Sequence, residues 1–346
     1  MGRFMTQPRS KAAASGRTAG LGTARPTRKP RDPQLDRAVY AMARLAILCF
    51  RALPAGWAPT VGRALGRLGW RVSRRYRNQV LRHMDIAFRD EYPRAQKEAW
   101  CLKYFEHTGL SLVEFARMGA ITQETVDSVA DLSELKAVDT LLAQGHGKGV
   151  LFVPAHHGNW ELSGHLVGLK GLPIQSVARP LDNPLLDEMV REMREQGGNR
   201  IIEKWNVLWY LKKLLDQGHL VTMSIDQNGG VAGCFIPVFG TPASTVTSPA
   251  DLQLATKIPL VVGTLNRQAD GIRHRFHLWD VIPFERTGTV EEDKVRILAR
   301  IHRAYEKAIR AYPEQWLWVH KRWKTRPPGE EPGPDGLPPT VHAKSE

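Results

Sequence analysis

The chain has few cysteines and lacks a secretion signal. Its 346 residues include only Cys49, Cys101 and Cys234, which are far apart and odd in number. This argues against a disulfide framework and against a cysteine metal cluster, and it fits a reducing compartment that faces the cytosol. No segment combines a basic start, an apolar core and a small-residue cleavage site, so we expect no signal peptide.

A long apolar run is also missing. The most apolar N-terminal segment, 38–53, has 16 residues, whereas a helix that spans a bilayer needs about 20. Arg44 interrupts this segment. We therefore expect an interfacial or shallowly embedded helix, with Arg37, Arg44 and Arg51 reaching toward lipid headgroups. An ordinary core helix is the alternative.

Acidic residues are nearly absent from two N-terminal segments. Residues 1–34 hold eight basic residues and one acid, a charge of +7, and residues 63–82 hold seven arginines and no acid, another +7. Because the whole chain carries +14, the remainder is about neutral. Residues 1–34 also have almost no large apolar side chain, so we expect them to be disordered. Both segments predict contacts with an anionic partner, a lipid surface or nucleic acid, with solvated surface as the alternative.

Residues 61–81 favour the lipid surface. Apolar side chains recur there at steps of three and four while arginines fall mainly on the other side, as in a basic amphipathic helix. The apolar stripe consists of Val61, Leu65, Leu68, Val72 and Tyr76. Gly62, Gly66 and Gly69 count against a helix. No nucleic-acid-binding motif accompanies the arginines, so we expect no nucleic-acid partner.

The rest of the chain predicts an α/β fold. Strand-like apolar runs lie at 149–154, 174–177, 220–225 and 259–264, and an alternating run lies at 274–281. Helical patterns lie between or after them at 162–169, 184–196, 207–217, 249–257 and 291–311, and residues 94–147 also look helical. Strands that alternate with helices indicate a mainly parallel central sheet flanked by helices.

Four segments follow from these patterns. We expect a disordered basic tail at 1–34, an N-terminal helical membrane-associating segment at 35–93, and a catalytic α/β domain at 94–325. Residues 326–346 are rich in proline and glycine, which predicts a second disordered tail.

The run from His156 to Glu161, His-His-Gly-Asn-Trp-Glu, is the strongest candidate site. It joins an apolar strand to a helix, and active sites of α/β sheets collect at such strand ends. A histidine there can take a proton near neutral pH, and a carboxylate five positions on can orient its ring. We therefore predict that His156 and Glu161 form an acid–base pair. A histidine in an ordinary surface loop is the alternative.

Two other kinds of site remain open at this run. His157, Glu161 and His165 would share a helix face and could hold a metal, although their spacing is not the H-E-x-x-H of zinc enzymes. Ser163 does not stand in a G-x-S-x-G elbow, which disfavours a serine hydrolase.

Two further strand ends carry polar side chains. Arg179 stands between a strand and two prolines that fix the backbone, so it can hold a phosphate or carboxylate in a fork. A salt bridge at a helix cap is an equal interpretation. Asp226 can orient His156, position substrate or cap a helix.

Two apolar segments permit two interpretations each. Residues 235–243 can cover a pocket or pack in the core. The tryptophan-rich segment 312–324 suits a headgroup region or the edge of the core.

Four blocks in this order resemble the bacterial lipid A biosynthesis acyltransferase family, of the lauroyl and myristoyl acyltransferase type. They are HHGNWE, ARPLDNP, DQNGG followed by FIPVFGTPAS, and PEQWLWVHKRWK, and the resemblance covers roughly residues 36–325. The resemblance implies an H-x-x-x-x-D/E motif, which His156 and Glu161 match. His156 would deprotonate an acceptor hydroxyl as it attacks an acyl thioester, and Glu161 would orient and charge-stabilise His156. Arg179 would meet an acceptor phosphate.

The resemblance also implies partners and a location. The donor would be acyl carrier protein or acyl-CoA, and the acceptor a glycolipid, in the first place a lipid A precursor. A lysophospholipid or mannoside-type acceptor stays open, as does a basic membrane- or nucleic-acid-binding protein without catalysis. The family acts at the cytoplasmic face of the bacterial inner membrane, here as a peripheral or monotopic protein, and the chemistry requires no metal or organic cofactor. The candidates for binding substrate are Arg179, Asn159, Asp226, Gln227 and Arg322.

Overall fold

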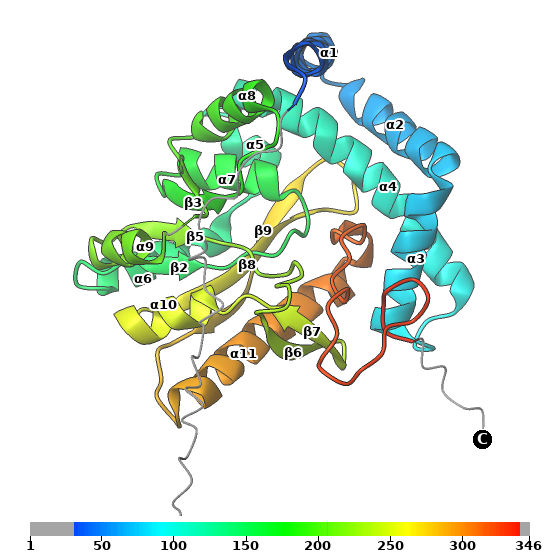
Figure 1. Ribbon diagram of the computed structural model, residues 1–346. Helices are drawn as coiled ribbons and strands as arrows, with labels where there is room; N and C mark the ends of the chain where they lie inside the picture. Colours follow the sequence, from blue (N-terminus) through cyan, green and yellow to red (C-terminus); the bar gives the residue numbers. More distant parts are fainter. Residues whose placement is uncertain (1–30, 206, 340–346) are drawn as a thin grey trace, which may run out of the picture.

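A seven-stranded sheet forms the centre of the molecule (Figure 1). The structure is a computed structural model, and it describes residues 31–205 and 207–339. The strand order is β1-β9-β8-β2-β5-β3-β4, and every neighbouring pair is parallel except β8–β9. This confirms the predicted mainly parallel α/β sheet. The strands are β1 (Ala130–Asp131), β2 (Val150–Phe152), β3 (Ile174–Ala178), β4 (Arg200–Glu203), β5 (Leu220–Thr222), β8 (Leu260–Arg267) and β9 (His274–Ile282).

Helices cover both faces of this sheet. Successive residues of β2 point to opposite faces: Leu151 packs in the core formed with α9, α10 and α11, and Phe152 packs in the core formed with α6, α7 and α8. This double coverage explains why β2, most of β5 and the first half of β8 are continuous apolar runs. The helices are α5 (Val126–Val129), α6 (Lys136–Gln144), α7 (Trp160–Leu169), α8 (Pro184–Glu195), α9 (Leu208–Asp216), α10 (Ser248–Thr256) and α11 (Val290–Ala311).

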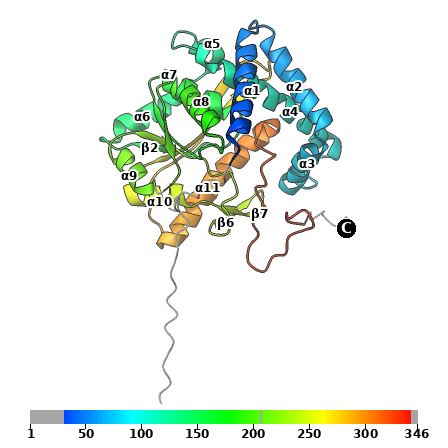
Figure 2. The same cartoon turned by 45° about the horizontal axis from the view of Figure 1, so that its top comes forward.

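The N-terminal helices form an outer layer at one end of the molecule, with α1, α2 and α4 close together (Figure 2). They are α1 (Pro33–Ala52), α2 (Ala58–Val72), α3 (Arg74–Phe88) and α4 (Arg94–Arg117). The single helix predicted over 61–81 is two helices that meet at Ser73. Residues of α3 such as Met84 belong to the core of the sheet, so α3 packs inward on the sheet domain.

Close packing explains the glycines of α2, which the sequence counted against a helix. Gly62 and Gly66 are buried against α4. A Cβ at Gly66 would lie 2.2 Å from the carbonyl oxygen of Phe105, and a Cβ at Gly109 would lie 2.2 Å from that of Gly62. The glycine face of α2 therefore packs inward. The leucine face, which includes Leu68, stays exposed.

Short or irregular elements were missed by the sequence patterns. β1 has two residues and β4 four, too few to show a period. Residues 235–243 pack in the core, which was one of their two interpretations, since Ile236, Val238 and Ala243 are buried there. The hairpin that they mostly form was not predicted: β6 (Cys234–Val238) pairs antiparallel with β7 (Thr241–Thr245). Phe239 and Gly240 turn it with φ of 50° and 71°, the left-handed pair that a two-residue hairpin turn requires.

The C-terminal segment differs from the predicted disordered tail. Arg82 of α3 binds Asp335 with 2.6 Å between Nε and Oδ2, and Leu337 is buried. The part of the segment that includes Asp335 and Pro338 is therefore held against α3, and 340–346 lie outside the described residues. The predicted basic tail lies outside them as well, apart from 31–34. Among the helices of the described residues, none combines the length and the apolar character needed to cross a membrane.

Candidate active site

The turn between β2 and α7 presents His156. Gly158 has φ of +66°, and a Cβ there would lie 1.9 Å from the carbonyl oxygen of Leu265, so the turn requires glycine. Asn159 then caps α7, because its Oδ1 accepts a hydrogen bond of 3.1 Å from the amide of Leu162. The turn packs so closely against β8 that its shape is imposed by the sheet.

Asp226 is the carboxylate that holds His156. Oδ1 of Asp226 lies 2.7 Å from Nδ1 of the ring, and Oδ2 accepts the backbone amide of His156 at 2.7 Å. Trp316 donates its Nε1–H to the same Oδ2 at 2.9 Å. Asp226 follows β5, the neighbour of β2, so the two residues meet at the carboxyl edge of the sheet.

The pair shifts both pKa values in favour of charge separation. Burial alone would raise the pKa of Asp226, but His156 and the hydrogen bonds it receives hold that pKa well below its ordinary range. Burial alone would lower the pKa of His156, but the charge of Asp226, with a smaller contribution from Glu161, raises it above 6.5. An ionised Asp226 accepts the Nδ1 proton, which leaves Nε2 as the basic nitrogen.

Glu161 lies beside this pair but bonds elsewhere. Both of its oxygens accept hydrogen bonds from Arg194 of α8, at 2.8 and 2.6 Å. The sequence predicted that Glu161 would orient His156, yet the structure gives the contact with the ring to Asp226. Glu161 and Arg194 both line the same cavity as His156.

His157 is held inside the protein. Its Nε2 donates to the carbonyl oxygen of Tyr312 at 3.0 Å, and its Nδ1 lies 2.9 Å from Nδ2 of Asn266. Burial lowers its pKa to about 4. A neutral ring with both nitrogens engaged cannot serve as the base.

A cavity of about 580 Å³ opens beside His156. That volume is in the range of pockets that take small molecules. It is lined by residues that follow four adjacent strands: His156 after β2, Gln227 after β5, Arg179 after β3 and Lys204 after β4. Its apolar wall includes Phe152, Trp160, Val167, Ile174, Ile201 and Met223.

Arg179 lies at the rim of this cavity. Its guanidinium is exposed and 3.4 Å from Asp182, an exposed pair of small energetic weight. Lys204 is partly buried, and burial, with the charge of Arg179, lowers its pKa. Its ammonium stands 4.7 Å from the centre of the Trp205 ring. Two cations thus stand close together at the mouth of the cavity.

Three of the predicted substrate-binding residues do not line the cavity. Asp226 is buried against His156, and Arg322 and Asn159 are placed behind the site. Arg322 is buried and bonds to Thr245 Oγ1 at 2.5 Å and to His302 Nε2 at 3.1 Å. Asn159 is buried as the cap of α7. Neither lines the cavity, because the core encloses them. The nearby Trp316, Trp318 and Trp323 are also buried, so the tryptophan-rich segment belongs to the core.

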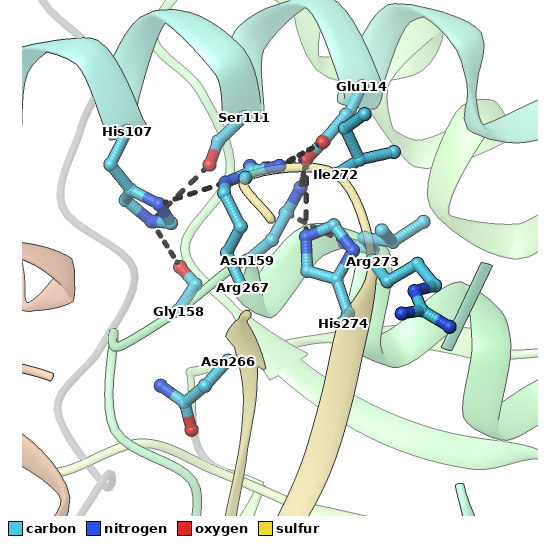
Figure 3. A network of polar contacts seen from close by, with 12 residues as sticks. His107, Ser111, Glu114, Gly158, Asn159, Asn266, Arg267, Ile272, Arg273 and His274 are labelled. Carbon is cyan, nitrogen blue, oxygen red and sulfur yellow. Dashed lines mark hydrogen bonds and ion pairs between the residues drawn. The ribbon is translucent and has the colours of Figure 1, made fainter. Parts of the chain in front are cut away.

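A second polar cluster supports the turn from the side of α4 (Figure 3). Glu114 accepts two hydrogen bonds from Arg267 at the end of β8, one of them 2.7 Å from Nη2 to Oε2. The same Oε2 accepts Nδ2 of Asn159 at 2.7 Å. His107 lies about two turns before Glu114 in α4. Its Nε2 is 3.1 Å from the carbonyl oxygen of Gly158.

Sequence reasoning missed Arg194, Lys204, Glu114 and Arg267. None of them stands in a recognisable motif, and Arg194 and Glu114 look like surface charges of amphipathic helices. The nearest signal is the position of Lys204 just after a strand, but β4 itself was not predicted. Among the described residues, no group of three or more His, Cys, Asp or Glu side chains has the arrangement of a metal site.

An imidazole held by a buried carboxylate at the edge of an open cavity is the arrangement of a general-base transferase or hydrolase. Comparison with known proteins shows which of these two classes the chain belongs to. Residues 28–325 match the family model described as bacterial lipid A biosynthesis acyltransferase. The chain belongs to this family and is an acyltransferase.

Curated relatives agree with this membership. The chain is 26% identical over 271 residues to the lipid A biosynthesis lauroyltransferase of Escherichia coli K12, which covers 78% of this chain and 86% of that protein. It is 26% identical over 286 residues to the palmitoleoyltransferase of the same organism, covering 82% and 87%. The Escherichia coli myristoyltransferase is 22% identical over 293 residues, covering 84% and 87%.

Proposed function

We propose that this acyltransferase transfers a fatty acyl chain from a thioester to a hydroxyl of a lipid A precursor, with His156 as the general base. The observation that carries the proposal is the His156–Asp226 pair beside a cavity with apolar walls and a cationic rim. The named relatives, which act in lipid A biosynthesis, support the acceptor class.

Nε2 of His156 removes the proton from the acceptor hydroxyl as its oxygen attacks the thioester carbonyl. The tetrahedral intermediate collapses, the C–S bond breaks, and the proton on Nε2 passes to the departing thiolate. The products are an ester and a free thiol, and His156 is again neutral. Asp226 keeps the proton on Nδ1 and stabilises the imidazolium that forms between the two steps.

Glu161 acts on His156 through its charge. Its negative charge favours the protonated ring, while Arg194 fixes the carboxylate at the wall of the cavity. This retains the charge-stabilising role expected for Glu161 and assigns the orientation of the ring to Asp226.

The assay that tests the function uses the purified chain, an acyl thioester and a lipid A precursor. Acyl-carrier-protein and acyl-CoA donors are compared side by side, and the product is identified by a mass gain of one acyl group. Transfer to a lysophospholipid or to a mannoside-type glycolipid, with none to the lipid A precursor, would overturn the proposed acceptor. Thioester turnover without an acylated lipid would overturn transfer itself.

Arg179 and Lys204 are proposed to bind a phosphate of the acceptor. β2, β5 and β3 are adjacent strands. Neighbouring strands are about 4.8 Å apart, so Arg179 after β3 is displaced across the sheet from His156 after β2 by about 10 Å. A phosphate held at this rim would leave a more distant hydroxyl of the same glycolipid to reach Nε2. The mutual repulsion of the two cations would be relieved by the phosphate.

We expect the double variant Arg179→Ala/Lys204→Ala to raise KM for a phosphorylated acceptor by about 100-fold or more, because each charge-assisted contact contributes about 1.5–3 kcal/mol. KM for the thioester donor is expected to stay near the wild-type value. Arg200→Ala is the control, since Arg200 is exposed at the opposite end of β4. An equal loss with a dephosphorylated acceptor would contradict phosphate recognition.

The exposed face of α1 and α2 is proposed to bind an anionic membrane surface, at the cytoplasmic face of the bacterial inner membrane. Leu45, Leu68 and Val72 are more than half exposed on it, and exposed arginines surround them. Asn183, in the turn that follows Arg179, binds the carbonyl oxygen of Asp36 in α1 at 2.9 Å. The N-terminal end of α1 therefore lies beside the turn that follows Arg179, a placement that suits an acceptor arriving from a bilayer.

We expect the triple variant Leu45→Ser/Leu68→Ser/Val72→Ser to weaken binding to anionic vesicles at least tenfold, because each buried leucine or valine contributes about 1.5–3 kcal/mol. Vesicle co-sedimentation at two salt concentrations measures this. Val295→Ser on α11, also an exposed apolar side chain, is the control and should bind as the wild type does. Unchanged binding of the triple variant would exclude this face.

A further inference from the structure

We propose that Glu114 of α4, together with Arg267, is a positioning residue for the catalytic turn, and that it acts on His156 through Asn159. The inference rests on the proposed role of His156 as the base. Glu114 does not line the cavity, so it acts on the reaction only through the residues it holds.

The turn is held from two sides. On one side, the amide of Gly158 donates to the carbonyl oxygen of Gln315, which follows α11, at 2.9 Å, and the amide of Asn159 donates to that of Leu265 in β8 at 2.9 Å. These are backbone bonds that almost any residue could make. On the side of α4, the contacts come from specific side chains, which Figure 3 shows pointing from the helix to the turn.

Glu114 is the centre of the contacts from α4. Its carboxylate receives both terminal nitrogens of Arg267 and Nδ2 of Asn159, and His274 lies 3.5 Å from Oε2. Burial alone would raise its pKa, but Arg267 holds it well below the ordinary range. The carboxylate therefore stays ionised and accepts the hydrogen bonds of both Arg267 and Asn159.

The geometry links this charge to the base in three steps. Glu114 fixes the Asn159 side chain, Asn159 caps α7 through Leu162, and the backbone between Asn159 and His156 has no slack because Gly158 is pressed against β8. Arg267, the other partner of Glu114, is itself held in place, because its backbone exchanges two hydrogen bonds of 2.9 Å with the Gln315 side chain. Movement at Glu114 would therefore displace His156 from Asp226.

Two variants separate positioning from capping. Asn159→Ser retains an N-cap hydroxyl but is too short to reach Glu114. Glu114→Gln retains one acceptor oxygen and loses the charge that Arg267 pairs with. We expect each to lower kcat about 10- to 100-fold with KM nearly unchanged, because small displacements of a reacting group cost rate rather than binding. The double variant should be little worse than the stronger single one. Glu98→Gln, an exposed residue of the same helix, is the control.

Two readouts distinguish positioning from a loss of stability. Loss of the Asp226 contact lowers the pKa of His156, so the acid limb of kcat should move to lower pH. Hydrogen exchange of the amides of 156–159 should accelerate, a measurement that needs no turnover and stands even if the wild-type chain transfers nothing to a lipid A precursor. A lower melting temperature with an unmoved acid limb and unchanged exchange at the turn would overturn the proposal. If Glu114→Gln does not fold, Asn159→Ser alone decides it.

Discussion

His156→Ala is expected to remove acyl transfer and leave the fold intact. The variant loses the nitrogen that is proposed to take the proton of the acceptor hydroxyl, and positioned bases contribute about 10²- to 10⁴-fold in rate. The side chain of His156 is about a quarter exposed, so its removal leaves no large cavity in the core. The measurement is the rate of mass gain of the acceptor, with the melting temperature recorded in parallel.

His157→Ala is the matched control because the two histidines are neighbours with opposite surroundings. His157 is fully buried and bonded on both ring nitrogens, so its loss should cost stability, by about 1–3 kcal/mol or more for the unsatisfied partners. Its folded fraction should still carry out transfer. Wild-type-like transfer by His156→Ala would remove the assignment of the base. Loss of transfer by a fully folded His157→Ala, with His156→Ala active, would exchange the two roles.

Asp226→Asn is expected to lower kcat by about 10²- to 10⁴-fold through the tautomer of His156. The position of Oδ2 faces two donors, the amide of His156 and Nε1 of Trp316. The amide oxygen of the new asparagine must therefore occupy that position. Its NH₂ group then faces Nδ1 and donates to it, which moves the ring proton to Nε2 and removes the basic lone pair from the side of the substrate.

The pH dependence of the same variant has a definite sign. The base must be neutral to act, so wild-type transfer falls as the pH drops through the pKa of His156, which Asp226 raises above 6.5. Without that charge, burial dominates and lowers the pKa, so the acid limb of the residual activity moves to lower pH. The profile of kcat/KM against pH measures this shift.

Glu161→Gln provides the comparison, since Glu161 influences His156 by charge alone. Its acid limb should move in the same direction but less than that of Asp226→Asn, because Asp226 contributes the larger effect on the pKa. A larger displacement in Glu161→Gln would show that Glu161, as the motif suggested, is the main partner of the ring.

The sequence by itself determined the class of fold and marked the residue that is proposed as the base. Apolar runs predicted β2, β3, β5 and β8, because burial on both faces of a sheet leaves a local signature, and an alternating run predicted β9. The position of His156 just after such a run marked it as a candidate, because strand ends of α/β sheets carry the chemistry. The four ordered blocks indicated the family that the comparison confirmed.

Only the tertiary structure decided which residues meet. Asp226 is 70 positions from His156 and reaches it because β5 lies beside β2, a pairing that no local pattern encodes. The same holds for Arg194 with Glu161 and for Glu114 with Asn159. Burial decided the rest: Arg322 and the tryptophans, which resembled surface binders, are enclosed by the core, and the glycines of α2 are buried in a contact with α4. Local patterns report which face of an element is apolar, whereas the partner of a side chain depends on how distant elements pack.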